Sequence, residues 1–333
     1  MKLKVYKLHF TSPLHISGTR DDYSVSLKTI ASDTMMAALT SCLAKIGESI
    51  PEKGDLGFVI SDSFPFYQET ETSAPVFFFP RPLKINLPDQ IEDTNLKKIK
   101  KVKWFDKYYF EKVLGGDIMF QNSDIRRIKC DEYIVDKNQS KNFNGIFESQ
   151  VTPRVTIARD GVSDSVPYYV EKITFRDFSG LYFIVDGDTE LLEKAMNLLK
   201  EEGIGTDRNV GNGFFEYDTD EIELSLPESA DNILSLSNYI PSKSEELTEL
   251  LGGDKIAYEF HRRGGWITTY PYNSLRKKYV YAFVPGSVFK RPNHATDSGL
   301  LKLGEVVDLK PDNIGVSHSI WRNGKSIFLP IKL

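Results

Sequence analysis

The densest chemical signal in the sequence is a glycine-rich segment, GIGTDRNVGNG, at residues 203–213. Four of its eleven residues are glycines: Gly203, Gly205, Gly211 and Gly213. Glycines adopt backbone conformations that other residues resist, and they let a phosphate approach the backbone N–H groups closely. Arg208 adds a cation at the centre, but no Gly-Lys-Ser/Thr follows, and Arg208 takes the place of the last glycine of a Gly-x-Gly-x-x-Gly fingerprint. The segment predicts either a phosphate-binding loop of another kind or a helix C-cap followed by an irregular turn.

Charged residues are segregated along the C-terminal third of the chain. Residues 262–291 contain seven lysines and arginines, no acidic residue, and seven interleaved aromatic rings. Cations among stacking rings suit single-stranded nucleic acid. Residues 216–231 carry seven acidic residues and no basic one, which would repel RNA and suit a basic protein partner. Each run is also compatible with an ordinary solvated surface, as is the lysine-rich segment LKKIKKVK at residues 96–103.

Histidines raise the question of catalysis. None of the five forms an HExxH or His-x-His pair, and two cysteines are too few for a cysteine zinc site, so we expect no metal and no cofactor. His15 is the one candidate acid or base for RNA chemistry, and it can equally bond a phosphate. Asp33 is interpreted as the N-cap of the following helix. Without a plausible second acid or base near His15, we expect a protein that is not an enzyme.

The order of predicted elements indicates how these residues are positioned. A strand over residues 3–11 leads to a polar loop, a helix with one apolar face from Asp33 to Ile46, and a strand over 58–66. Alternation at 168–175 and a continuous apolar run after Gly180, up to Val185, predict strands, followed by a helix and a last strand over 214–226. This order fits a ferredoxin-like βαββαβ unit. The fold class is therefore α+β, with a first domain over residues 1–226 and a second, smaller α+β domain over residues 227–333.

Residues 84–166 form a predicted insertion in the first domain. It holds one helix candidate, Trp104–Leu114, and an Asp160-Gly161 turn with an alternating arm that predicts a hairpin over 154–163. The preceding segment, 75–83, is aromatic but contains three prolines, so we expect an edge or extended segment rather than a central strand.

Composition limits the possible classes of protein. The 333 residues are 40% hydrophobic and 27% charged, which excludes a collagen-like, a disordered and a membrane protein. A formal charge of −5 leaves no global basic field, so any nucleic-acid site must be local. The first ten residues predict a strand rather than a signal peptide, and no apolar run approaches the ~20 residues of a membrane span. We therefore expect a soluble cytoplasmic protein that does not bind membranes.

Several motifs in a fixed order make the sequence similar to a known family. They follow a ferredoxin-like start and are SPLHISGTRDDYSVSLKTIASDTMMAAL (12–39), SFPF (63–66), FFFPRPL (77–83), GLYFIV (180–185), GIGTDRNVGNGFFE (203–216) and GEVVDL…HSIWRNGKSIFLPI (304–331). Together they resemble the RAMP superfamily of CRISPR-associated proteins, and within it the fourth subunit of the type III-A, or Csm, effector complex. The resemblance spans nearly the whole chain.

The resemblance implies two ferredoxin-like (RRM-like) domains and a non-catalytic, RNA-binding role in a ribonucleoprotein. Such subunits hold the 5′ repeat-derived tag of the guide RNA between the large polymerase-like subunit and the backbone RAMP subunits. A protruding hairpin, called the thumb, disrupts the guide–target RNA duplex near the tag. Carried onto this chain, the RNA-binding residues lie in the first loop, the thumb and the glycine-rich loop: His15, Arg20, Lys28, Arg154, Arg159, Gly203, Gly205, Arg208, Gly211 and Gly213. Asp207 dilutes the positive charge of the last loop.

Two alternatives to this function stay open from the sequence. Some members of the superfamily are ribonucleases that process repeat RNA with a histidine near the first helix, and His15 is the only suitable residue here. The acidic stretch at 216–231 also keeps open a protein-assembly subunit whose RNA contacts are incidental.

Overall fold

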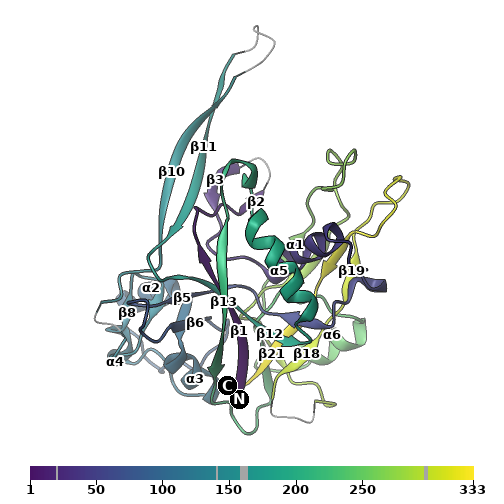
Figure 1. Ribbon diagram of the computed structural model, residues 1–333. Helices are drawn as coiled ribbons and strands as arrows, with labels where there is room; N and C mark the ends of the chain where they lie inside the picture. Colours follow the sequence, from purple (N-terminus) through teal and green to yellow (C-terminus); the bar gives the residue numbers. More distant parts are fainter. Residues whose placement is uncertain (20–21, 140–141, 158–163, 296–298) are drawn as a thin grey trace.

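The computed structural model describes residues 1–19, 22–139, 142–157, 164–295 and 299–333. The fold is mixed α+β, with several sheets and few helices (Figure 1). Within these ranges no helix is both long and apolar enough to cross a membrane. The same ranges hold no group of three or more metal-binding side chains.

The largest sheet is built around the first strand, β1 (Lys2–Phe10). β1 pairs antiparallel with β12 (Gly180–Gly187) on one side and with β13 (Phe215–Glu223) on the other. β12 also pairs with the two short strands that replace the single predicted strand at 58–66, β4 (Phe58–Ile60) and β5 (Phe64–Tyr67). Helices α1 (Ser32–Lys45) and α5 (Glu190–Glu202) pack against each other and close one core over the sheet.

The aromatic segment at 75–83 forms an inner strand, which corrects the prediction of an edge. β6 (Val76–Pro80) pairs with β5 on one side and with β7 (Trp104–Asp106) on the other. All five residues of β6 are buried. The strand tolerates its prolines because Pro75 lies before it and Pro80 is its last residue, after which the N–H of Arg81 resumes the pairing with the carbonyl of Lys103.

The insertion has more regular structure than predicted. The lysine-rich segment contributes to α2 (Asp93–Lys101), and the candidate helix at 104–114 divides into β7 and α3 (Lys107–Gly115). The division occurs at Asp106, whose carboxylate accepts from the N–H of Tyr109 and caps α3. The remaining elements are short: α4 (Asn122–Ile125), β8 (Ile128–Lys129) and β9 (Tyr133–Ile134).

A long hairpin of β10 (Phe147–Thr156) and β11 (Val166–Phe175) projects from the body of the molecule (Figure 1). The predicted hairpin at 154–163 falls on its outer part, and the strands extend much further toward the base. Residues 158–163 lie outside the described residues. At the base, β11 packs against β3 (Asp22–Ser26), which pairs with β2 (Ser17–Thr19) in the loop after β1.

The C-terminal part is built on a four-stranded sheet in the order β17-β14-β21-β18. Its strands are β14 (Asn232–Ser235), β17 (Val288–Lys290), β18 (Leu301–Leu303) and β21 (Ser326–Ile331), and α6 (Ser244–Leu251) packs on β17. Two ribbons complete it: β15 (Phe260–Arg263) with β16 (Val280–Phe283), and β19 (Val306–Asp308) with β20 (Trp321–Asn323). Side chains of β14 and β21 join those of β1 and α3 in one hydrophobic core, so the two halves of the chain pack tightly together.

Candidate nucleic-acid interface

The glycine-rich loop lies against the segment that follows β1. The N–H of Gly213 donates to the carbonyl of Pro13 at 2.9 Å, and the N–H of Thr206 donates to the carbonyl of His15 at 2.8 Å. Within the loop, the N–H of Ile204 donates to the carbonyl of Gly213 at 2.9 Å. Two of the predicted RNA-binding segments, whose bonded residues are 191 and 200 positions apart in the sequence, therefore form one surface.

Glycine is required at two of the loop positions by space as well as by conformation. Gly205 has φ +101°, and a Cβ there would lie 2.5 Å from the carbonyl oxygen of His15. Gly213 has φ +78°, and its Cβ would collide with the backbone carbonyl of Ile204. Gly203 and Gly211 also have positive φ, and Gly211 has open space around it. The glycines thus allow the loop to fold back on itself between α5 and β13.

The hairpin reaches the same loop through an ion pair. The guanidinium of Arg154 on β10 donates to the carboxylate of Asp207 at 2.9 Å, and both side chains are partly exposed. Asp207 itself has φ +61°. Asp207 therefore pairs with the hairpin and not with its neighbour Arg208, whose guanidinium lies 3.8 Å from Glu202 at the end of α5. Arg208 keeps 45% of its side-chain surface exposed and remains available to a phosphate.

His15 is placed differently from the other predicted residues. Its side chain is fully buried, and Nδ1 lies 2.7 Å from the carbonyl oxygen of Glu171 on β11. Its Nε2 is buried without a hydrogen-bond partner in the part of the chain that the structure describes. His15 therefore joins the first loop to the hairpin base through its side chain and to the glycine-rich loop through its carbonyl.

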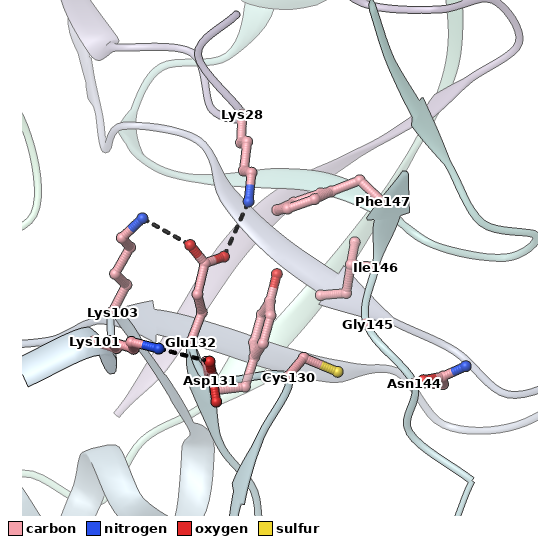
Figure 2. Close-up of a pocket in the computed structure, with 11 residues that line it drawn as sticks. Lys28, Lys101, Lys103, Cys130, Asp131, Glu132, Asn144, Gly145, Ile146 and Phe147 are labelled. Atoms are coloured by element: carbon pink, nitrogen blue, oxygen red, sulfur yellow. Dashed lines mark hydrogen bonds and ion pairs between the residues drawn. The ribbon is translucent and has the colours of Figure 1, made fainter. Parts of the chain in front are cut away.

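Lys28 lies at the base of the hairpin in a pocket of about 470 Å³ (Figure 2). Its ammonium donates to Glu132 at 3.1 Å and lies 4.9 Å from the centre of the Phe147 ring. Lys103 donates to the other oxygen of Glu132 at 2.7 Å, and Lys101 donates to Asp131 at 2.9 Å. Partial burial raises the pKa of Glu132, but its bonds with Lys103 and Lys28 outweigh burial and hold the pKa below its ordinary value.

The structure brings together most of the predicted residues, but not all of them can be placed. Arg20 and Arg159 lie outside the described residues. The sequence favours a solvated face for Lys101 and Lys103, and only the fold places them beside Lys28. The charge of Asp207 is evident from the sequence, but its pairing with Arg154 is not. The two residues are 53 positions apart, so no local sequence pattern predicts their contact.

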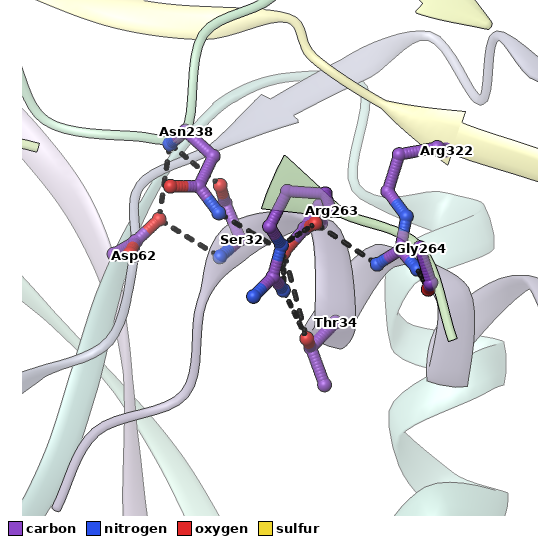
Figure 3. A network of polar contacts seen from close by, with 8 residues as sticks. Ser32, Thr34, Asp62, Asn238, Arg263, Gly264 and Arg322 are labelled. Carbon is purple, nitrogen blue, oxygen red and sulfur yellow. Dashed lines mark hydrogen bonds and ion pairs between the residues drawn. The ribbon is translucent and has the colours of Figure 1, made fainter. Parts of the chain in front are cut away.

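Asp33 does not act as the predicted helix cap. The N-cap of α1 is Ala31, and no side chain bonds the first turn from that position. The buried carboxylate of Asp33 instead binds the guanidinium of Arg263 through Nε at 2.6 Å and that of Arg322 through Nη1 at 2.9 Å (Figure 3). Burial raises the pKa of Asp33, but Arg322 and Arg263 outweigh it and hold the pKa below its usual range. Asp33 thus ties α1 to the C-terminal half.

Asp62 lies beside this cluster and behaves in the opposite way. Its carboxylate accepts from the N–H of Ser32 at 2.8 Å and from the N–H of Asn238 at 3.1 Å (Figure 3). Complete burial raises its pKa to about 6, against the lowering effect of these hydrogen bonds. The two carboxylates have different environments because cations surround only Asp33.

Comparison with known proteins identifies relatives of the chain. Residues 228–331 match the family model of the CRISPR Csm4 C-terminal domain. The "CRISPR system Cms protein Csm4" of Thermococcus onnurineus is 26% identical over 319 residues, which cover 90% of this chain and 91% of the relative. The protein of the same description from Streptococcus thermophilus is 24% identical over 350 residues and covers both chains completely.

Solved structures show the same fold. A Csm3–Csm4 subcomplex of the type III-A CRISPR-Cas interference complex contains a chain with a TM-score of 0.63 and 16% identity, with complete coverage of both chains. A Csm1–Csm4 cassette in complex with cA4 contains one with a TM-score of 0.61 and 20% identity, covering 100% of this chain and 99% of the other. The resemblance to the fourth subunit of type III-A complexes is therefore confirmed by the match of residues 228–331 to the CRISPR Csm4 C-terminal domain model and by the similarity of nearly the whole chain to Csm4 proteins.

Proposed function

We propose that this protein is a non-catalytic RNA-binding subunit of a type III-A CRISPR effector ribonucleoprotein that holds the 5′ repeat-derived tag of the guide RNA. One observation carries the proposal. The first loop, the hairpin and the glycine-rich loop, which the family resemblance assigns to RNA, meet at His15, Arg154 and Asp207. This junction presents the guanidinium of Arg208, whose side chain is 45% exposed and which is a donor that suits a phosphate.

The proposed partners follow from the relatives. Structurally similar chains occur with Csm1 in one set of structures and with Csm3 in another. We propose that this chain likewise bridges the large polymerase-like subunit and the backbone subunits. The projecting hairpin of β10 and β11 is proposed to act as the thumb against the guide–target RNA duplex, because it extends from the junction away from the body (Figure 1).

A finer description of the fold supports the same proposal. The strands β13, β1, β12 and β5 lie side by side in that order, and α1 and α5 follow β1 and β12 in the chain. We propose that this is the ferredoxin-like unit expected for the first domain, with the insertion between its second and third strands. The four-stranded sheet with α6 is proposed as a second, degenerate unit of the same kind.

The absence of catalysis is part of the proposal and rests on His15. A general acid or base must come within hydrogen-bond distance of the reacting atom. His15 is fully buried, and one ring nitrogen already bonds the carbonyl of Glu171. The test is direct: purified wild-type protein should leave repeat RNA intact with and without divalent cations. Cleavage into discrete products would favour the alternative, a repeat-processing ribonuclease.

RNA binding at the glycine-rich loop is tested with Arg208→Glu. A hydrogen bond to a charged group is worth about 1.5–3 kcal/mol, so affinity for a guide carrying its 5′ tag should fall about tenfold to a hundredfold. The salt dependence should also weaken by about one phosphate contact. The melting temperature should stay nearly unchanged, because the ion pair with Glu202 is long and partly exposed.

Lys302→Glu is the matched control for this experiment. Lys302 is about as exposed as Arg208 and pairs with Asp186 through a surface ion pair, away from the junction. Both substitutions replace a positive charge by a negative one, so a general electrostatic effect would lower the RNA affinity of the two variants equally. Equal affinity of Arg208→Glu and wild type, with an equal salt slope, would show that the glycines only form a turn.

A further inference from the structure

The ribbon formed by β15 and β16 carries a row of exposed aromatic rings on one face. Directly paired residues of an antiparallel ribbon share a face, and here Phe260 pairs with Phe283 and Arg262 pairs with Tyr281. Tyr279 follows on the same face, two residues from Tyr281. The rings form an unbroken series, with centroids 5.7 Å apart between Phe260 and Tyr281 and 6.1 Å apart between Tyr281 and Tyr279.

These rings are unusually accessible for their size. Phe260 is 57% exposed, Tyr281 is 54% exposed and Tyr279 is 59% exposed. Only the inner end of the row is covered, because Phe283 packs into a small core with Tyr239 and Phe289. A contiguous group of large exposed rings of this kind is uncommon on a protein surface and indicates a binding site.

The opposite face of the ribbon anchors it to the body. Arg263 points to the other side and forms the bidentate ion pair with Asp33 on α1. His261, on the same inner face, pairs with Ala282, which is fully buried. The aromatic face is therefore presented by a ribbon that is held in place, so little ordering is required when a ligand binds.

Two guanidinium groups are stacked on rings of this ribbon. Arg262 lies over Tyr279, with 4.7 Å from its Cζ to the ring centre, and Arg276 lies over Trp266 at 5.0 Å. Trp266 and Arg276 form a bridge that continues the ribbon beyond β15 and β16. Among the residues that the structure describes, neither arginine has an ion-pair partner, so their N–H donors are available to an anion. Stacking on a ring holds each guanidinium in place.

We propose that this aromatic face is a binding surface for single-stranded RNA, separate from the tag-binding junction and indifferent to base sequence. Exposed rings accept bases of any kind by stacking, and guanidiniums beside them contact the phosphates. A protein partner would also suit the rings, but residues 262–291 carry no acidic residue, and the two guanidiniums stacked on the rings are positive. Positive charge beside the rings complements a phosphate backbone.

The structure also predicts the form of the binding. Three of the five other cations of the segment are committed. Arg263 is bound to Asp33, Lys278 donates to Asp312 at 2.7 Å, and Arg291 donates to the carbonyl of Ala295 at 3.2 Å. Two phosphate contacts, from Arg262 and Arg276, therefore accompany the stacking. For a single strand this corresponds to a slope of about −1.4 in a plot of log affinity against log salt. Binding should persist at moderate salt, because stacking of the bases on the rings supplies most of the binding free energy.

The test measures fluorescence anisotropy of a labelled 15-nucleotide oligouridine, which lacks any repeat-derived tag, with the full-length protein. Tyr281→Ala and Arg262→Gln should each weaken binding about tenfold. Tyr108→Ala and Lys112→Gln are matched controls, because Tyr108 on α3 is 46% exposed and has the ammonium of Lys112 4.9 Å from its ring centre. Both controls should bind as the wild type does. Photo-crosslinking with 5-iodouridine RNA should label Tyr279 or Tyr281.

The outcomes separate this surface from the tag-binding junction. Arg208→Glu should leave oligouridine binding through the ribbon largely intact, so the two sites can fail independently. No oligouridine binding by wild type, or equal binding by the ribbon variants and the controls, would overturn the proposal. Normal oligouridine binding by Tyr281→Ala together with lost association with the large or backbone subunit would overturn it in favour of a protein-docking surface.

Discussion

The buried carboxylate of Asp33 provides the sharpest prediction about stability, through the variant Asp33→Ala. The side chain of Asp33 is 1% exposed and accepts two hydrogen bonds from Arg263, one from Arg322 and one from Asn238. Arg263 and Arg322 are themselves only 20% and 9% exposed. Removing the carboxylate leaves two positive charges largely out of water without an anion.

The magnitude follows from this burial. Removing one partner of a buried ion pair costs about 3–5 kcal/mol, because the remaining charge stays desolvated. We therefore expect the free energy of unfolding of Asp33→Ala to fall by about 3–5 kcal/mol. At about 2 °C per kcal/mol for a chain larger than about 200 residues, the melting temperature should fall by about 6–10 °C.

Urea unfolding followed by circular dichroism and tryptophan fluorescence measures the change. Asp312→Ala is the matched control, because its ion pair with Lys278 is exposed on both sides, and surface pairs are worth about 0–1 kcal/mol. If Asp33→Ala lowered the free energy of unfolding by less than about 1 kcal/mol, as Asp312→Ala should, the reasoning would be refuted. Such a result would mean that water or other groups replace the carboxylate.

The stabilisation that the Asp33 carboxylate provides should also depend on pH. The folded pKa of Asp33 lies below its ordinary value of 3.8, so its stabilisation is fully present above about pH 4 and is lost as pH falls through the folded pKa. In the Asp62→Asn background, which removes the titration of the neighbouring carboxyl group, the stability difference caused by Asp33→Ala should therefore be constant from pH 5 to pH 8 and shrink in acid. A difference that shrinks near neutral pH would contradict this assignment.

Three further predictions concern other parts of the molecule. The pKa of Asp62 is raised from 3.8 to about 6. The free energy of unfolding of wild type should therefore fall by about 3 kcal/mol between pH 4 and pH 7 relative to that of Asp62→Asn, which keeps the accepting oxygen. Equal pH profiles of the two proteins in urea unfolding would contradict this. Gly213→Ala should lower the melting temperature clearly more than Gly211→Ala, because both have positive φ but only Gly213 meets a backbone carbonyl. Deleting residues 154–163 should leave complex assembly intact and change nuclease protection of the guide–target duplex near the tag; loss of folding would show that the segment is part of the core.

Local patterns in the sequence were enough to predict the main elements. Alternation indicated the strands that became β1 and β13, and a continuous apolar run indicated β12, because one or both faces of each strand are buried. Apolar spacing marked α1 and α5. The four glycines marked a loop in which all four residues have positive φ. These features depend on neighbours within a few residues, so the sequence shows them directly.

Elements whose conformation depends on distant partners were predicted less well. The segment at 75–83 contains three prolines, yet β6 is an inner strand because Phe77, Phe78 and Phe79 are buried among residues from β5, β7 and α3. The gain from burying these rings outweighs the missing proline donors, which fall at the ends of the strand. Burial by remote segments is a property of the tertiary structure.

Charge pairing was decided entirely by the fold. Asp33 has the type and position of a helix cap, but Arg263 and Arg322 reach it from positions more than 200 residues away. Lys28 and Lys103 meet at Glu132, and Arg154 meets Asp207, with equally little local signal. The sequence shows which residues carry charge. Only the packed chain determines which charges are close enough to neutralise one another and which, like that of Arg262, have no ion-pair partner in the described part of the chain.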